Sequence, residues 1–337
     1  MHNVKRVPQP TLSAEAIAEK RAEEQKKLDV YKKVEDTYLT FRAQQAFTPE
    51  ALESTTSLLA CNPEYYSAWN YRRDILLHMF EKETSAAPGE ASLQTKLLEE
   101  DLSLLQQSMR THPKVYWLWN HRRWCLMMLP PAGSDDQAKQ AKWRKEIGLV
   151  DMMLEMDPRN FMGWNYRRWI IEELAKTMVP EGYETTPPFP SSLSSSLPTS
   201  VKEAHLALAL NELKYTLRKI ESNFSNFSAW HNRSKLLPCV WDAQQLDETQ
   251  RRERREQEFE LLQQAMYTDP SDQSVWIYHR WLVAQDPSEA TLTEQIQVIE
   301  ELLALEPDNK WCIESLAHYK QQLASQGTYL AFETRAN

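Results

Sequence analysis

Two basic residues stand at equivalent turns of a repeated motif, and their chemistry suits an anion. Lys114 and Arg159 each directly follow a proline, in consecutive copies of the motif. In a stack of repeats, equivalent turns line up along one edge, so the two cations would converge beside Tyr116 and Asn160. Ammonium, guanidinium, phenol and amide donors together could hold a diphosphate through charge-assisted hydrogen bonds. The competing interpretation is that both cations are solvated turn residues, because Lys and Arg side chains are mostly exposed.

The other copies of the motif differ at this position. The residues directly after the turn proline, or after the phenylalanine that replaces it in the fourth copy, are Glu64, Lys114, Arg159, Ser225, Ser271 and Asp308. The chain contains no Gly-rich phosphate loop, no HExxH sequence and no Cys/His cluster with metal-ligand spacing. Any catalysis would therefore depend on a partner that brings the reactive centre.

A tryptophan signature of the form P-x-x-y-x-x-W-N-x-R-R positions these residues. Its tryptophans, spaced 50, 45, 66 and 46 residues apart, are Trp69, Trp119, Trp164, Trp230 and Trp276. A degenerate sixth copy begins at Glu306-Pro307. The period indicates a helical-repeat architecture and is longer than the ~34 residues of tetratricopeptide repeats. An amphipathic helix precedes each copy, and the motif is predicted to start the second helix, with Asn, His or Asp before Pro as its N-cap. We therefore expect an all-α solenoid of stacked antiparallel hairpins.

The motif tryptophans and arginines are predicted to be structural, because what recurs in every repeat is usually what stacks the repeats. The arginines are Arg72, Arg122, Arg167, Arg233 and Arg280. They are expected to pair with acidic residues of neighbouring helices, such as Glu99, Glu100 and Asp101 or Glu146 and Asp151.

The domain organisation is predicted to be a single helical-repeat domain over residues 1–337. An N-terminal helix is expected over about 13–45, and the repeats over about 48–323. The Ser- and Pro-rich stretch 178–200 accounts for the 66-residue spacing and is interpreted as a flexible surface insertion.

Composition excludes several classes of function. Only 6 Gly in 337 residues argues against a β protein, and the net charge of −9 argues against nucleic-acid binding. The four scattered cysteines are expected to be reduced, and no apolar run approaches the ~20 residues of a membrane span. We expect a cytoplasmic protein that is not integral to a membrane.

The five registered copies resemble the α subunits of protein prenyltransferases over nearly the whole chain. The resemblance implies a right-handed superhelical, crescent-shaped solenoid that partners a β subunit. It also implies that the β subunit carries the zinc and the isoprenoid cavity. The family's α-subunit lysine that contacts the isoprenoid diphosphate matches Lys114, with Tyr116, Arg159 and Asn160 as the neighbouring binding residues.

Within the family, three segments are similar to α subunits of Rab geranylgeranyltransferase: the start Met1-His2, residues 223–238, and Asp308-Asn309-Lys310-Trp311-Cys312. The length resembles the compact, fungal-type form. This implies geranylgeranyl diphosphate, a Rab GTPase and a Rab escort protein as partners. The alternatives are an α subunit shared by farnesyltransferase and type I geranylgeranyltransferase, or a non-catalytic helical-repeat scaffold.

Two positions call for separate predictions. Met162 stands where family members often have His, so a polar contact made there by other members is in doubt. His2 is a candidate transient ligand of the partner's zinc, since an N-terminal imidazole could reach it. The competing interpretation of His2 is a terminus without fixed structure.

Overall fold

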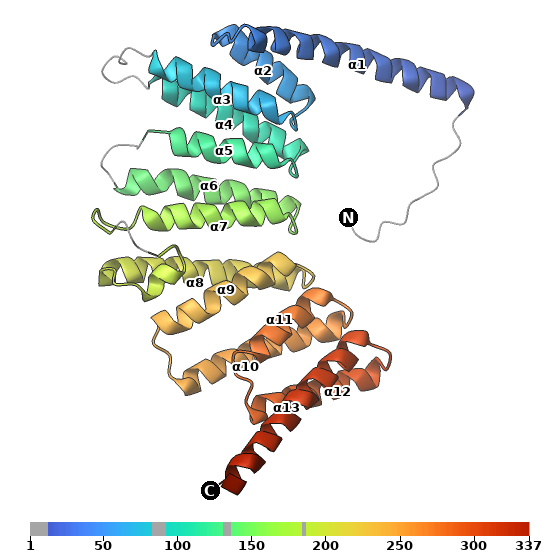
Figure 1. The fold of residues 1–337 in the computed structure, drawn as a ribbon, viewed down its shortest axis with the longest axis vertical. Helices are drawn as coiled ribbons and strands as arrows, with labels where there is room; N and C mark the ends of the chain where they lie inside the picture. The colour runs from blue at the N-terminus through green and yellow to red at the C-terminus, as the bar shows by residue number, and fades with distance from the viewer. Residues whose placement is uncertain (1–12, 83–91, 131–135, 184–186, 337) are drawn as a thin grey trace. The chain divides into compact units, whose positions relative to one another are not determined.

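The computed structural model describes residues 13–82, 92–130, 136–183 and 187–336, and the regular structure in these ranges is helical (Figure 1). The chain divides into two compact units, Met1–Pro131 and Ala132–Asn337. The prediction of a single domain stays a prediction.

The first unit combines one long helix with two helical hairpins. Its helices are α1 (Ala14–Ala43), α2 (Pro49–Cys61), α3 (Tyr66–Glu81), α4 (Leu93–Thr111) and α5 (Tyr116–Met128). α2 packs against α3 and α4 against α5, while α1 packs against α2. Ser13 and Thr48 cap α1 and α2 with their hydroxyl oxygens, and Pro49 occupies the first turn of α2, where its missing N–H costs nothing. α1 covers most of the segment predicted as the N-terminal helix.

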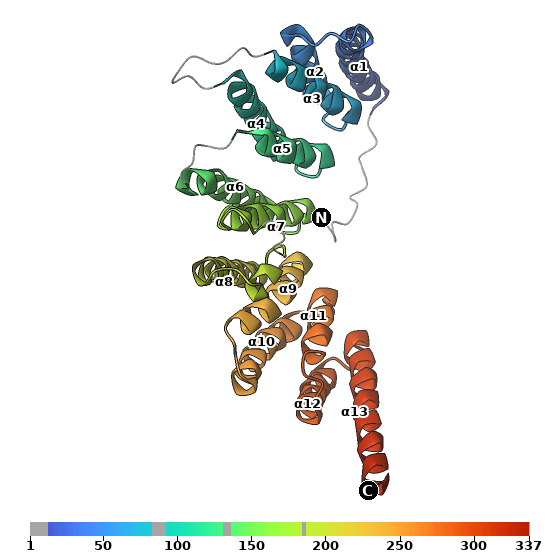
Figure 2. The ribbon, with the colours of Figure 1, turned by 60° about the vertical axis from the view of Figure 1, so that its left-hand side comes forward.

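The second unit contains four further helix pairs (Figure 2). Its elements are α6 (Asp136–Met156), α7 (Phe161–Lys176), the 3₁₀ helix η1 (Ser191–Ser194), α8 (Thr199–Ser222), α9 (Phe227–Ala243), α10 (Glu248–Thr268), α11 (Gln273–Val283), α12 (Glu289–Leu305) and α13 (Lys310–Ala336). The pair α12–α13 spans the degenerate sixth copy. The predicted all-helical architecture of stacked helix pairs is confirmed, whereas its handedness and crescent outline stay predictions.

One-sided apolar stripes explain why the first helix of each pair packs. In α4, the side chains of Leu98, Leu105 and Met109 are fully buried. They are separated by seven and four residues, so they lie on one face of the helix. The hydrophobic effect on this face fixes α4 against α5.

The turn of each hairpin corrects the predicted N-cap. Asn62, His112 and Asp269 are C-caps of the preceding helices, and the second helices begin four residues later. The reason is that proline disfavours the α region in the residue before it, which here ends the first helix rather than starting the second. The Asn62 carboxamide oxygen then accepts from Glu64 N at 3.1 Å, which shapes the turn.

The motif tryptophan closes this turn in every clear copy. Its indole Nε1–H donates to the carbonyl oxygen six residues earlier, at the proline or, in the fourth copy, at Phe224. The five N–O distances are 2.9, 2.9, 2.8, 2.7 and 2.8 Å for Trp69, Trp119, Trp164, Trp230 and Trp276. All five side chains are at most 4% exposed. The tryptophan therefore combines core packing with a hydrogen bond that fixes the turn, which favours the structural interpretation.

The described part of the 178–200 segment differs from the predicted flexible insertion. Leu193 of η1 is buried in a cluster with Leu236 and Val240 of α9. The buried Ser192 hydroxyl lies 3.0 Å from His205 Nδ1, and His205 Nε2 lies 3.0 Å from the Ala175 carbonyl oxygen. Since a carbonyl only accepts, Nε2 carries the proton and the Ser192 hydroxyl donates to Nδ1. Composition did not predict this packing because a few apolar residues among the serines are enough to anchor the segment.

Candidate functional site

The N-terminus of α5 presents the cation that the sequence singled out. Lys114 is exposed in the turn before α5, and Tyr116, the first residue of the helix, is 59% exposed. Val115 occupies the N-cap position, and no side-chain hydrogen bond caps this end of the helix. A helix N-terminus carries a partial positive charge and outward-facing N–H groups. Lys114 therefore adds a full charge to a place that already favours anions.

The equivalent end of α7 is built differently. Arg159 is exposed, whereas Asn160 is 2% exposed and forms the N-cap. The Asn160 carboxamide oxygen accepts from the backbone N–H groups of Met162 and Gly163, at 3.1 and 3.4 Å. Its oxygen is thus committed to the helix, and a contact with substrate would have to come from its amide nitrogen.

Later repeats supply a structural role for an asparagine at this position. Asn226 caps α9, and its amide nitrogen donates to the Pro158 carbonyl at 2.9 Å. Asn309 donates in the same way to the Pro270 carbonyl at 3.0 Å. A role in stacking hairpins is therefore the competing interpretation for Asn160. Because Lys114 and Arg159 lie in different units, their predicted convergence stays a prediction.

Three of the motif arginines, Arg72, Arg167 and Arg233, form buried ion pairs with carboxylates of neighbouring helices. Arg72 pairs with Asp101, and Arg167 pairs with Asp151 and with Glu212, at 2.6 Å from the latter. Burial alone would lower the pKa of Arg167, but the neighbouring Glu212 carboxylate raises it. Arg233 pairs with Glu258 and Arg122 donates to the Leu102 carbonyl at 2.8 Å. Glu212 and Glu258 were not foreseen, because the sequence does not show which acidic residue of a neighbouring helix faces each arginine.

The fifth copy departs from the prediction for Arg280. That residue is exposed, and it follows Trp276 by four positions rather than the three found at the buried arginines. His279 takes the buried place instead and is 1% exposed. Its Nδ1 lies 2.9 Å from the Tyr319 hydroxyl and its Nε2 lies 3.0 Å from Gln295 Oε1. A shift of one position along the helix explains why Arg280 is exposed and His279 is buried, since neighbouring positions on a helix point 100° apart.

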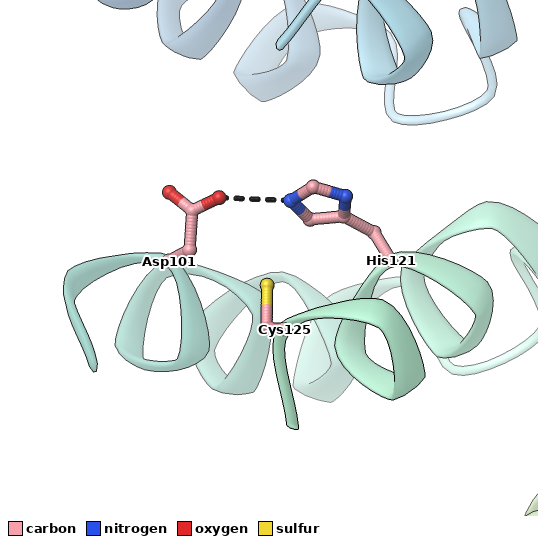
Figure 3. Close-up of side chains that lie close together, drawn as sticks. All are labelled: Asp101, His121 and Cys125. Carbon is pink, nitrogen blue, oxygen red and sulfur yellow. Dashed lines mark hydrogen bonds and ion pairs between the residues drawn. The ribbon is translucent and has the colours of Figure 1, made fainter. Parts of the chain in front are cut away.

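Asp101 of α4 and His121 and Cys125 of α5 form the one buried group in the described residues whose atoms could meet a metal (Figure 3). Their potential ligand atoms lie within 4.8 Å of one another. However, Arg72 donates its Nε and Nη2 to the Asp101 carboxylate, at 3.0 and 2.5 Å. His121 Nε2 lies 2.8 Å from Asp101 Oδ2, and Arg73 Nε donates to His121 Nδ1 at 3.1 Å. A cation does not fit between two guanidinium groups where the carboxylate and the imidazole are already engaged.

The charge states of this group follow from burial and hydrogen bonding. Burial alone would raise the pKa of Asp101, but hydrogen bonds from His121 and Arg72 outweigh it and hold the pKa at about 2. Burial lowers the pKa of His121 to about 4, against the opposing effect of Asp101. Burial also raises the pKa of Cys125 well above its usual value. The group is therefore a carboxylate, a neutral imidazole and a thiol, which is a structural network rather than a nucleophile.

The remaining sequence predictions concern the chain's N-terminus, Met162 and membranes. His2 lies outside the described residues, so its role stays a prediction. Met162 is partly buried in the first turn of α7, where its backbone N–H is bonded by the Asn160 cap. Among the helices in the described ranges, none combines the length and apolarity that crossing a membrane requires.

Comparison with known proteins agrees with this architecture. The protein prenyltransferase alpha subunit repeat matches residues 48–79, 98–129, 143–174, 209–239 and 255–286. The geranylgeranyl transferase type-2 subunit alpha of Candida albicans is 31% identical, over 94% of this chain and 86% of the relative. Its counterpart in Schizosaccharomyces pombe is 34% identical, over 95% of this chain and 86% of the relative.

A solved structure, Candida albicans protein geranylgeranyltransferase-I complexed with GGPP, matches with a TM-score of 0.58 at 18% identity, over 88% of this chain and 81% of that chain. At this identity the match supports the fold alone. Paired helices and five repeat matches define the class as a prenyltransferase-type helical-repeat subunit. The chain belongs to the protein prenyltransferase α-subunit family, as an α subunit of the geranylgeranyl transferase type-2 kind.

Proposed function

We propose that the chain is the α subunit of a heterodimeric Rab geranylgeranyltransferase. The enzyme transfers geranylgeranyl from geranylgeranyl diphosphate to C-terminal cysteines of Rab GTPases that an escort protein presents. The observation that carries the proposal is the identity of 31% and 34% with two type-2 α subunits over most of both chains. The chain has no activity alone in this proposal, because the reactive centre belongs to the β subunit.

The β subunit would hold the zinc, which lowers the pKa of the acceptor thiol when it is bound. The Asp101–His121–Cys125 group does not fit a metal, so this chain's described residues offer no competing site. The role proposed for this chain is electrostatic. As the cysteine sulfur bonds to the first carbon of the isoprenoid, the carbon–oxygen bond breaks and the diphosphate departs with the electron pair.

Lys114 is the residue proposed to stabilise that departing charge. Its ammonium group and the uncapped N-terminus of α5 provide positive potential at one place. Tyr116 follows Lys114 by two residues and offers a phenolic hydroxyl beside it. Arg159 and Asn160 are proposed as further contacts of the diphosphate. Because Asn160 also caps α7, its replacement would disturb the helix as well, so that residue is tested separately.

The Lys114→Ala variant tests this assignment. We expect turnover of the reconstituted heterodimer to fall about 10²-fold, the cost of removing one donor to a developing oxyanion. Affinity for the β subunit and the thermal unfolding midpoint should stay unchanged, because Lys114 is exposed. Lys96→Ala, at an exposed position of α4, is the matched control. Wild-type turnover in Lys114→Ala would favour the non-catalytic scaffold hypothesis.

The choice of β subunit tests the enzyme class. The chain is co-expressed separately with a type-2 β subunit and with a farnesyltransferase or type I β subunit. We expect copurification and Rab prenylation with the type-2 β subunit, and dependence of that reaction on the escort protein. Copurification with the other β subunits, with transfer to short C-terminal peptides, would instead support the shared α subunit.

A further inference from the structure

Arg73 differs from the buried motif arginines in what surrounds its charge. It is half-buried on α3, next to Arg72. Its Nε donates to His121 Nδ1 at 3.1 Å and its Nη2 donates to Asn120 Oδ1 at 2.8 Å. Its guanidinium carbon lies 5.4 Å from the centre of the Trp124 ring. All three neighbours are uncharged, since His121 is a neutral imidazole.

The contrast with the other arginines shows that the charge of Arg73 is uncompensated. Burial alone would lower the pKa of Arg73, Arg167 and Arg233 alike. Carboxylates more than offset this at Arg167 and Arg233, whereas at Arg73 burial prevails and the pKa is lowered. The nearby carboxylate of Asp101 is already engaged by Arg72. Within the described residues, Arg73 therefore forms no ion pair, and partial desolvation of such a cation favours binding of an anion.

The surface around Arg73 exposes large apolar side chains of α3 and α5. Tyr66 and Leu77 of α3 are 59% and 39% exposed, at seven residues before and four after Arg73. Tyr116 and Met127 of α5 are both 59% exposed, at four residues before and seven after Asn120. These spacings place each pair on the helix face that carries Arg73 or Asn120. We call the residues Tyr66, Arg73, Leu77, Tyr116, Asn120 and Met127 the Arg73 surface.

The first helices of the same two hairpins lack such a surface. In the described part of the first unit, α2 exposes no large hydrophobic side chain, and α4 exposes only Leu93, at 37%. Aromatic residues, Met and Arg together are the composition that distinguishes the cores of protein interfaces. The second helices, α3 and α5, thus expose large apolar side chains that the first helices, α2 and α4, mostly lack. This difference indicates that a protein partner covers the Arg73 surface.

We propose that the Arg73 surface binds the partner subunit and that Arg73 receives a carboxylate from it. The inference rests on the proposed heterodimer. The occupant is a protein rather than a free anion because large exposed apolar side chains flank the guanidinium on both helices. An aspartate or glutamate of the partner would complete the fork that His121 and Asn120 leave partly filled.

The test compares the affinity of full-length Arg73→Gln and wild-type chains for the type-2 β subunit. We expect the dissociation constant to rise at least tenfold, equivalent to about 1.4 kcal/mol. The affinity of the variant should also depend less on salt. The control is Arg110→Gln, at an exposed arginine in the last turn of α4. It removes the same charge from a first helix of a hairpin and should change affinity less than twofold.

Hydrogen exchange provides a second measurement that needs no substitution. Binding of the β subunit to the wild-type chain should slow amide exchange in α3 and α5 more than in α2. This result would support the surface even if Arg73→Gln destabilised the fold through its bonds to His121 and Asn120. Slower exchange in α2 alone would overturn the proposal.

The outcomes separate this inference from the proposed function. If the wild-type chain does not bind the type-2 β subunit, the proposed function fails and this inference fails with it. If wild type binds and Arg73→Gln binds equally well, only the inference fails. Unchanged subunit affinity together with a raised KM for geranylgeranyl diphosphate would overturn it in favour of a substrate-binding role.

Discussion

The substitution Asp101→Asn tests the buried network of α3, α4 and α5 most directly. It removes one negative charge and almost no volume. Asp101 accepts hydrogen bonds from Arg72 and His121, which lower its pKa from 3.8 to about 2 despite burial. At 1.36 kcal/mol per pKa unit, this difference corresponds to about 2.4 kcal/mol in favour of the charged form.

The loss in Asp101→Asn should exceed that value, because Arg72 is left buried without its counter-ion. Breaking a buried pair by removing one partner costs about 3–5 kcal/mol. Arg72 keeps its hydrogen bonds to the Thr55 and Thr56 hydroxyls, both at 2.8 Å, which limits the loss. We therefore expect the free energy of unfolding to fall by about 2.5–4 kcal/mol at pH 7.

Urea unfolding followed by circular dichroism measures this change, with the neighbouring exposed Glu100→Gln as control. The difference between wild type and Asp101→Asn should be full above about pH 4. It should shrink as the pH falls toward about 2, where the carboxylate of the folded protein takes up a proton. A loss below about 1 kcal/mol at pH 7 would show that Arg72 and His121 do not depend on the charge of Asp101.

Three further predictions concern stability. Burial holds the pKa of His121 and of His279 at about 4 in the folded chain, against 6.5 for an ordinary histidine. Above pH 6.5 each should therefore contribute up to about 3.4 kcal/mol to the free energy of unfolding, and this contribution is lost as the pH falls toward 4. Unfolding measured at pH 7.5 and 4.5 checks this, and an equal free energy at both values would contradict it. Trp230→Phe should cost about 1–3 kcal/mol, because the turn carbonyl loses its indole donor; an unchanged urea midpoint would mean that the bond contributes nothing. Ser192→Ala should speed limited proteolysis within 187–198 by removing the bond to His205, while Ser191→Ala at the exposed neighbour should not; equal rates would refute the anchoring role.

The repeat pattern predicted the fold because its information is local and recurs. The buried tryptophans and the pairing of Arg72 with Asp101 follow from one signature read in several copies. The turn was misjudged because proline fits both the end of one helix and the start of the next, and only the backbone shows which applies. Arg280 was misassigned because the fifth copy shifts its arginine by one position.

The candidate site was likewise predicted only in part. The sequence singled out Lys114 because charge at one position differed between copies. It did not reveal that Val115 leaves α5 without a side-chain cap, which is a property of the folded backbone. The sequence did not single out Arg73 for another reason. Every clear copy but the fourth has an arginine at that position of the motif, so an arginine there is not distinctive. Only the uncharged surroundings of Arg73 set it apart.

The indole-to-carbonyl bond within each turn has a consequence for how such a chain can change in length. It spans six residues in all five copies, so an inserted or deleted residue there would detach the indole. In the described residues, no motif tryptophan closes the connections at the opposite ends of the hairpins, because all five indoles bond within their own turns. These connections range from the four residues between α9 and α10 to the 22 residues between α7 and α8. Peptide tags or fluorophores grafted into those connections should therefore leave the register of the turns, and with it the place of Lys114, undisturbed.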